Sequence, residues 1–478
     1  MSKPLRITIN VLIAFILLIA LVIAILPNFQ KEWVTGVPHI DMQPKRGILD
    51  KKDIEAGSAY DLLLQATNLY DKEVEPYEFI SSEVYTRYTE SSNISSSDFV
   101  LLQNALNSAS NVMSLAIEAS KIENPIISHE FDFHYLPLGN VRTLSNFFAL
   151  EAFMHIKSNR FNLALNSWKN SMNFSNIISR GGFLINHLVL IATVAITTEN
   201  IQFAATQGKM PLHISKDLDL YLKKYEKNLE PIGEAFKYEV LFAAREIENI
   251  YSDPVSFSQN LGMNEKLFIP AKALSYLMGS NASNTSKNFE RLYSHLVKLS
   301  KMDYDIKEYD KIKKKFSKIS GPLELILTKD PIGFILSNTT YVPYAKSIIS
   351  HYQMQLNLRI TRLYLAIDQY YQKHKIIPKS LNKLVPQFID ALPLDPFDGK
   401  ELKYKTLNRG AWLIYSVGED SLDQGGKYEN EIDLEVRFPQ SIQYGNDFIY
   451  ISSPPSVPPI KIEEPEIHTP VKRGRRRR

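Results

Sequence analysis

The stretch that decides the fold of the carboxy-terminal part reads IPKSLNKLVPQFIDALPLDPFDG, residues 377–399. Its prolines interrupt the helical pattern that precedes it, in which apolar residues recur at helical spacing up to Tyr370. That spacing predicts a helix of about thirty residues, which starts after Pro343 and ends near His374.

Short strands are expected after this proline-rich stretch. The segments 402–405, 411–418 and 432–438 are rich in aromatic and β-branched residues, which favour strands. We therefore expect a small α+β domain over residues 341–440, built from one long helix and a three-stranded antiparallel sheet.

Several short motifs follow one another in this domain. They are Ile377-Pro378-Lys379-Ser380-Leu381, Leu392-Pro393-Leu394-Asp395-Pro396-Phe397-Asp398-Gly399, Tyr404, Tyr415-Ser416-Val417-Gly418 and the acidic run EDSLDQGGKYENEIDL at 419–434. In this order they resemble the globular domain of the major pseudopilins of type II secretion systems, over about residues 350–438. The resemblance implies a pseudopilin-like fold, a structural calcium ion in the acidic loop and a link to secretion or pilus-like proteins.

The rest of the chain departs from the pseudopilin pattern. Pseudopilins begin with a peptidase-cleaved motif like G-F-T-L-I-E, and their membrane helix continues directly into the long helix of the domain. Residues 1–30 contain no such motif, and more than 300 residues separate them from the domain. We therefore expect a pseudopilin-type domain joined to a membrane-anchored helical protein, rather than a usual filament subunit.

The acidic run concentrates negative charge around two adjacent glycines. Its carboxylates from 419 to 433 are Glu419, Asp420, Asp423, Glu429, Glu431 and Asp433, against Lys427 alone. Calcium takes about 6 to 8 oxygen ligands in irregular geometry, which suits such a loop. By resemblance the ligands are Asp420 and Asp423, followed by Glu431 and Asp433, although the second half of the family motif fits residues 430–432 as well as 431–434. The alternative is a solvated acidic hairpin loop.

Asp395 and Asp398 flank a proline and a glycine outside this loop. Aspartate, proline and glycine in this arrangement are typical of a turn. We therefore expect a structural role for both aspartates.

An apolar segment near the amino terminus predicts a membrane anchor. Residues 11–26 are sixteen unbroken apolar residues within the segment 7–26, long enough to span a bilayer as a helix. Lys3 and Arg6 precede it, so the positive-inside rule predicts a single-pass inner-membrane protein with a cytoplasmic amino terminus and a periplasmic bulk. The alternative is a signal peptide cleaved after Val22-Ile23-Ala24.

Residues 31–340 read as an irregular α-helical domain, which makes the protein mainly α. Apolar spacing predicts a helical hairpin over 142–178, whose second half resembles a single tetratricopeptide repeat; an ordinary helix pair is the alternative. The segment 184–196 carries Asn186 and His187, so we expect a buried core helix with a hydrogen-bonded histidine rather than a second membrane span.

The last residues, 441–478, predict a proline-rich disordered tail that ends in an arginine cluster. The cluster is Arg473, Arg475, Arg476, Arg477 and Arg478. Such a cluster suits an anionic polymer or lipid, and a solvated tail is the alternative. Six cations in the last eight residues turn a body of 49 − 52 = −3 into a chain of net charge +3.

Composition and motifs bear on possible enzymatic functions. The chain has no cysteine, which excludes disulfides, cysteine-ligated zinc and cysteine nucleophiles. It has no nucleotide-binding glycine motif and no H-E-x-x-H or G-x-S-x-G motif. His129, Glu130, Asp132 and His134 form the nearest metal-like constellation, although an ordinary polar loop explains them as well.

These observations lead to three hypotheses about function. The first is a membrane-anchored, non-enzymatic envelope protein that serves as an interaction or scaffold component. The second is a hydrolase of envelope polymers with an unidentified carboxylate site. The third is a tether that binds anionic polymer through the arginine tail.

Overall fold

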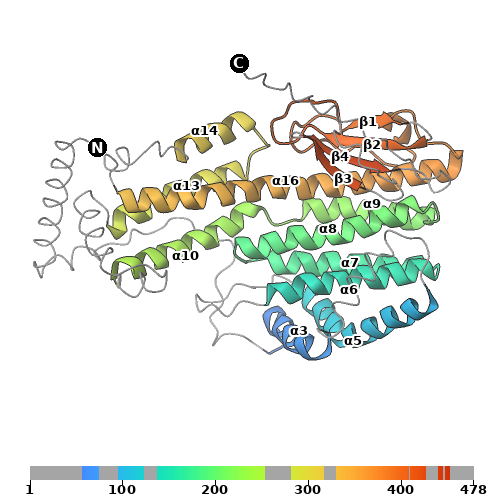
Figure 1. Ribbon diagram of the computed structural model, residues 1–478, viewed down its shortest axis with the longest axis horizontal. Coiled ribbons are helices and arrows are strands. Elements are labelled where there is room, and N and C mark those ends of the chain that lie inside the picture. Colours follow the sequence, from blue (N-terminus) through green and yellow to red (C-terminus); the bar gives the residue numbers. More distant parts are fainter. Residues whose placement is uncertain are drawn as a thin grey trace, which may run out of the picture.

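The computed structural model shows a mainly helical protein with one small antiparallel sheet (Figure 1). It describes residues 56–74, 95–122, 137–252, 281–316, 330–407, 410–426, 440–444 and 447–452. The helices are α3 (Ala59–Glu73), α5 (Ser96–Ser120), α6 (Leu138–Lys157), α7 (Phe161–Ser179), α8 (Leu184–Thr206), α9 (Leu212–Lys227), α10 (Ile232–Ser252), α13 (Ala282–Leu299), α14 (Ile306–Phe316) and α16 (Pro331–His374), with a short 3₁₀ helix, η2 (Leu381–Leu384).

Several sequence predictions lie outside the described residues. They are the membrane anchor at 1–30, the histidine constellation at 129–134, the strand at 432–438, the carboxylates Glu431 and Asp433, and the arginine cluster Arg473, Arg475, Arg476, Arg477 and Arg478. These stay predictions.

The expected helical hairpin is confirmed as α6 and α7, which pack against each other and against α8 (Figure 1). Asn159 in the turn adopts a positive φ of 56°, a conformation that asparagine tolerates better than most residues. Ala164 of α7 is fully buried, which allows the helices to approach closely. The hairpin is therefore part of a helical bundle with α8.

Helix α8 lies inside this bundle. Among the described residues it is the one helix long and apolar enough to cross a membrane, yet 61% of its most apolar window is buried by the protein. Its polar side chains bond to neighbouring helices: Trp168 Nε1 donates to Asn200 Oδ1 over 2.6 Å, and the Ser171 and Thr197 hydroxyls lie 2.7 Å apart. These contacts confirm the expectation of a core helix over 184–196.

Helix α16 begins twelve residues before Pro343, so the expected start is wrong. Pro343 lies within the helix with its side chain exposed, and the helix instead starts at Pro331, with Asp330 as its cap. Pro at the first helical position and a capping aspartate favour initiation there. The expected domain boundary near residue 340 therefore falls inside one helix, and a single hydrophobic cluster runs from Ala152 to Tyr450.

The sheet has the strand order β1-β2-β4-β3, and all neighbouring strands are antiparallel. Its strands are β1 (Lys403–Thr406), β2 (Trp412–Ser416), β3 (Gln440–Tyr444) and β4 (Asp447–Ser452). Strands β1 and β2 confirm two of the predicted strands. The prediction that the tail starts at residue 441 is wrong, because 440–452 forms a hairpin that makes this sheet four-stranded. The four consecutive apolar residues of β4, 448–451, explain the hairpin, since such a run favours a strand that is buried on both faces.

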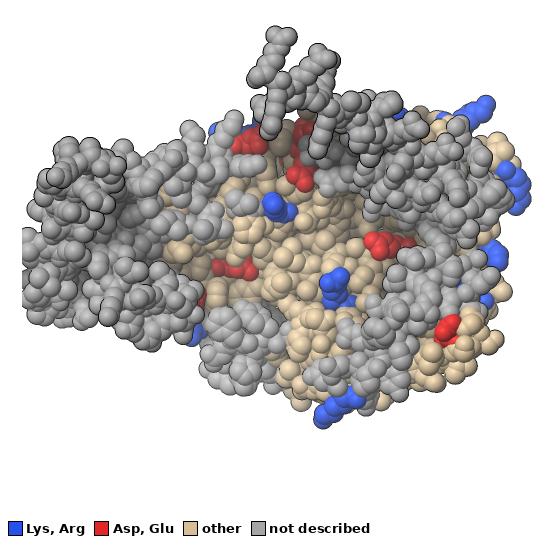
Figure 2. Space-filling model, viewed as in Figure 1, with Lys and Arg blue, Asp and Glu red and all other residues tan. Residues whose placement is uncertain are grey.

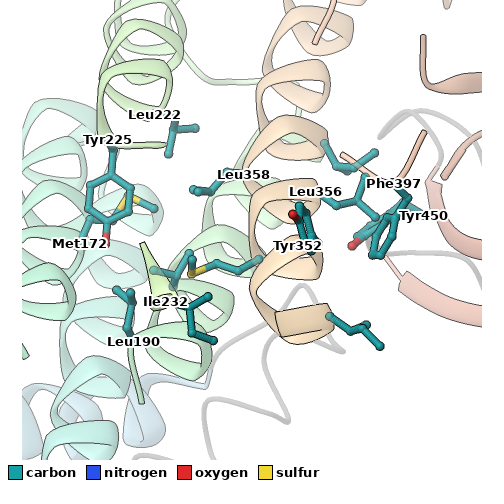
Figure 3. Close-up of a cluster of buried hydrophobic side chains, with 14 of the residues drawn as sticks. Met172, Leu190, Leu222, Tyr225, Ile232, Tyr352, Leu356, Leu358, Phe397 and Tyr450 are labelled. Carbon is teal, nitrogen blue, oxygen red and sulfur yellow. The ribbon is translucent and has the colours of Figure 1, made fainter. Parts of the chain in front are cut away.

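Helix α16 connects the bundle to the sheet (Figure 1). Figure 3 shows Leu358 directed toward the bundle side, whereas Tyr352 and Leu356 lie on the side of Phe397 and Tyr450. Farther along, the Tyr364 ring packs edge-on against Trp412 at 4.5 Å between centroids. The helix is therefore buried on two sides, which explains why its apolar positions do not follow a single stripe.

Candidate functional site

The acidic loop leaves the end of β2 from a buried aspartate anchor. Asp395 is 2% exposed, and it accepts hydrogen bonds from Ser416 Oγ at 2.9 Å and from the Val417 amide at 3.0 Å. Burial raises the pKa of this carboxyl, while the bonds from Phe397, Ser416 and Val417 act in the opposite direction. These bonds support the predicted structural role of Asp395, which fixes where the loop begins.

Asp420 and Asp423 are the two predicted ligands within the described residues. Asp420 Oδ1 accepts from the Leu422 amide at 2.9 Å, and its Oδ2 accepts from Gln424 Nε2 at 2.8 Å. Asp423 Oδ1 accepts from the Gly425 amide at 2.8 Å. Both aspartates therefore turn the loop locally.

A third carboxylate, Asp447, faces the loop and was missed by the sequence analysis. Its side chain is fully buried at the start of β4, where it accepts hydrogen bonds from the backbone amides of Gly426 at 2.9 Å and Gln424 at 3.5 Å. Burial raises its pKa, the two amide bonds oppose this, and the charges of Asp423 and Asp420 raise the pKa further. The three carboxylates are thus close enough to influence one another.

A turn signal in the sequence could have located Asp447. Gly445 and Asn446 immediately precede it, and such a pair between apolar runs is typical of a hairpin turn. The proline-rich stretch after residue 452 masks this signal, because it makes residues 441–478 as a whole resemble a disordered tail.

The glycine pair produces a tight bend in the loop. Gly425 and Gly426 have φ values of 83° and 55°, and a Cβ on Gly426 would lie 2.6 Å from the Tyr415 ring. Lys405 Nζ donates to the Gly425 carbonyl and lies 5.5 Å from the centre of the same ring. Only glycine can adopt this conformation against Tyr415 without strain.

The donor atoms of the loop fit a hard cation. Gln424 Oε1 is buried and receives no hydrogen bond among the described residues, while its Nε2 is committed to Asp420. Carboxylate and amide oxygens are the ligands that calcium prefers. Within the described part of the chain no group of three or more acidic, histidine or cysteine side chains is arranged around a common metal position.

The predicted core histidine is confirmed elsewhere in the bundle. His187 is 1% exposed, and its Nε2 lies 2.9 Å from Nδ1 of His351 on α16. The pair joins two helices, and this is the hydrogen-bonded structural role that was expected for His187.

Comparisons with models of protein families, with curated proteins and with solved structures find no match for this chain. The resemblance of residues 350–438 to pseudopilins, and that of 142–178 to a tetratricopeptide repeat, therefore remain predictions that rest on the motifs quoted above.

Proposed function

We propose that this chain is a non-enzymatic, single-pass envelope protein that serves as an interaction or scaffold component. Residues 1–30 anchor it in the inner membrane, and the helical bundle and sheet lie in the periplasm. Its link to type II secretion or pilus-like machinery rests on the pseudopilin-like motifs. A calcium ion in the acidic loop stabilises the carboxy-terminal sheet.

The observation that supports the calcium proposal is the number of oxygen donors along and beside one loop. The charges of Asp420 and Asp423 act on Asp447, and Gln424 adds a buried amide oxygen that receives no hydrogen bond from the described residues. A divalent cation would neutralise the repulsion that raises the pKa of Asp447. Glu431 and Asp433 follow in the sequence as further ligands.

Thermal unfolding of the full chain with calcium or with chelator tests this proposal. An ion that binds only the folded state raises the free energy of unfolding by about 2.7 kcal/mol when its free concentration is about a hundred times its Kd. We expect a higher Tm with calcium, and the loss of this increase in a variant with Asp420→Asn and Asp423→Asn. Equal Tm values with calcium and chelator would contradict the site.

Asp398→Asn is the matched control for these substitutions. Asp398 Oδ1 accepts from the Lys400 amide at 2.9 Å, which is the same local bond that Asp420 makes to Leu422. The control therefore removes a comparable carboxylate outside the loop. It should keep the full calcium response, and a control that lost the response would show that the effect is not specific to the loop.

The proposed non-enzymatic role has a direct test. Purified full chain is incubated with envelope polymers, and the release of soluble products is measured. We expect no turnover above background. Robust hydrolysis that disappears on a single carboxylate substitution would favour the hydrolase hypothesis instead.

We also propose that the arginine cluster at residues 473–478 contacts an anionic polymer or lipid. Its charge density supports this proposal, because closely spaced arginines attract phosphate groups. Retention of the chain on anionic vesicles should fall with added salt and after deletion of residues 471–478. Retention that is unaffected by both changes would dispose of this role.

A further inference from the structure

One end of the helical bundle is built from turns that carry only positive charge. The segments 155–160, 207–213 and 370–379 contain six Lys and Arg residues and no Asp or Glu. These residues are Lys157, Arg160, Lys209, Lys373, Lys375 and Lys379. We call the three segments together the basic end.

The fold brings the three segments of the basic end together. The ends of α6, α8 and α16 lie at the same, right-hand end of the molecule in Figure 1, and Lys and Arg side chains project along that edge in Figure 2. Gln372 Nε2 at the end of α16 donates to the Met210 carbonyl over 2.8 Å, which joins two of the segments. The pKa of Lys157 is lowered by burial and then by the charge of Lys209, which joins the third.

Helix dipoles account for only part of this charge. Lys157 and Lys373 lie in the last turns of their helices, where a cation is favourable. Arg160, however, immediately precedes α7, and a cation at a helix amino terminus is unfavourable. Lys209 and Lys379 lie beyond the helix ends. The positive charge of the basic end is therefore more than the helices require.

Two exposed aliphatic side chains accompany these cations. Leu212 is 52% exposed at the start of α9, and Ile376 is 58% exposed just after α16. The bond from Gln372 to Met210 joins the two segments that carry these side chains. Exposed aliphatic residues among lysines are typical of surfaces that rest on a membrane, where the cations meet headgroups and the aliphatic groups enter the interface.

We infer that the basic end binds a membrane surface rich in anionic lipid, with Leu212 and Ile376 entering the headgroup region. Charge complementarity identifies the occupant, because the three segments contain six cations and no Asp or Glu. This contact is distinct from the anchor at 1–30 and from the arginine cluster. It does not depend on calcium.

The absence of cysteine allows a site-specific test with the full chain. Ser158 is exposed in the turn between α6 and α7, so Ser158→Cys places a single environment-sensitive fluorophore on the basic end. The labelled chain is held in nanodiscs of neutral phosphatidylcholine and mixed with vesicles that contain phosphatidylglycerol. We expect a blue shift of emission with these vesicles, none with pure phosphatidylcholine vesicles, and reversal of the shift at high salt.

Charge reversal distinguishes the basic end from general attraction. The variant K209E/K373E/K375E should weaken binding about a hundredfold or more, at roughly fivefold for each cation lost. The control K301E/K311E/K346E makes the same change in net charge at exposed lysines elsewhere and should keep most of the shift. Equal loss in both variants, or no shift with anionic vesicles, would overturn the inference.

Two further tests concern the tail and the aliphatic residues. Vesicle capture by residues 471–478 alone would bring vesicles to the protein without shifting the emission of the label, and that result would also overturn the inference. In the variant Leu212→Ser with Ile376→Ser, we expect a smaller blue shift with salt dependence retained. An unchanged shift in this variant would contradict the insertion of the aliphatic residues.

Discussion

His187 Nε2 and His351 Nδ1 lie 2.9 Å apart and join α8 to α16 in the interior of the protein. The Gln355 amide nitrogen lies 3.3 Å from His351 Nε2, and since it can only donate, His351 Nε2 accepts. With the Gln355 amide in this orientation, His351 carries its proton on Nδ1 and donates it to His187. This arrangement requires both rings to be neutral. Protonation of His187 Nε2 would place it as a second donor against His351 Nδ1, and protonation of His351 Nε2 would place it as a second donor against the Gln355 amide.

The first prediction concerns acid stability. Burial lowers the pKa of His351 to about 4, and burial followed by the charge of His351 lowers that of His187 well below its usual value. Between about pH 6.5 and 4 the unfolded chain therefore holds more protons than the folded one, so stability falls as the pH falls. His351 alone should cost about 3 kcal/mol by pH 4, measurable by urea unfolding at a series of pH values.

Replacing the pair separates this effect from general acid unfolding. The double variant His187→Leu with His351→Leu should flatten the pH dependence of stability over this range. His213→Leu removes an exposed histidine on α9 and should leave the dependence unchanged. A double variant with the wild-type pH profile would show that the pair does not cause it.

The second prediction concerns an amide ladder between the same two helices. Asn357 Oδ1 accepts from Gln202 Nε2 at 2.9 Å, and Asn357 Nδ2 donates to Thr198 Oγ1 at 2.7 Å. Asn357→Ala leaves buried polar groups without these partners and should reduce the free energy of unfolding by about 1–3 kcal/mol. Chemical denaturation measures this difference.

Asn107→Ala is the control for this substitution. Asn107 Oδ1 accepts from Gln103 Nε2 at 3.2 Å on the exposed surface of α5, so it removes an amide pair that water can replace. Its effect should stay within about 0.5 kcal/mol. Equal effects at both positions would mean that burial of the ladder contributes nothing.

Local signals in the sequence predicted several parts of the structure correctly. The helical spacing around Asn159 located the hairpin of α6 and α7, and the polar residues of 184–196 distinguished α8 from a membrane span. Aromatic and β-branched residues located β1 and β2. In each case the deciding contacts are close in the sequence or follow from composition.

Features that depend on distant residues were not predicted. Helix α16 starts at Pro331 because α13 supplies partners to its cap, and helical spacing after Pro343 gave no sign of this. The hairpin at 440–452 is part of the sheet because β4 pairs with β2, whereas the prolines that follow it suggested a tail. Asp447 was missed from the acidic loop for the same reason.

The third prediction concerns the cap of α16. Asp330 is 1% exposed, and it accepts from the Gly333 amide, from Thr285 Oγ1 at 2.9 Å and from Asn288 Nδ2 at 2.7 Å. Asp330→Ala removes the cap and leaves two donors of α13 without their acceptor. The free energy of unfolding should therefore fall by roughly 3 kcal/mol or more. Thermal and urea unfolding would both report this loss.

Ser95→Ala provides the comparison for a simple cap. Ser95 Oγ accepts from the Asp98 amide at 3.1 Å at the exposed start of α5, and within the described part of the chain its bonds go only to residues 97 and 98. Its loss should cost about 0.5–2 kcal/mol. If Asp330→Ala lowered the free energy of unfolding no more than Ser95→Ala does, the bonds from Asp330 to α13 would not contribute to stability.

The fourth prediction concerns the ion pair between Arg362 and Asp219, which lie on α16 and α9. Arg362 Nε lies 2.7 Å from Asp219 Oδ1, and the two side chains are 6% and 11% exposed. Arg362→Met leaves a buried carboxylate without its partner and should cost about 3–5 kcal/mol, measured by urea unfolding at neutral pH. The double variant with Asp219→Leu should recover most of this loss, because it removes the stranded charge.

The pH dependence of the single variant tests this explanation. Burial raises the pKa of Asp219, and the hydrogen bond from Arg362 opposes that increase, so Arg362→Met should raise the pKa further. A carboxyl whose folded pKa lies above its unfolded value stabilises the fold at low pH and loses this contribution as the pH rises. The loss of stability in Arg362→Met should therefore shrink as the pH falls toward 4. The control Lys311→Met breaks an exposed ion pair with Glu308 and should change the free energy of unfolding by less than about 1 kcal/mol. A deficit that is constant with pH would indicate lost packing rather than a stranded charge.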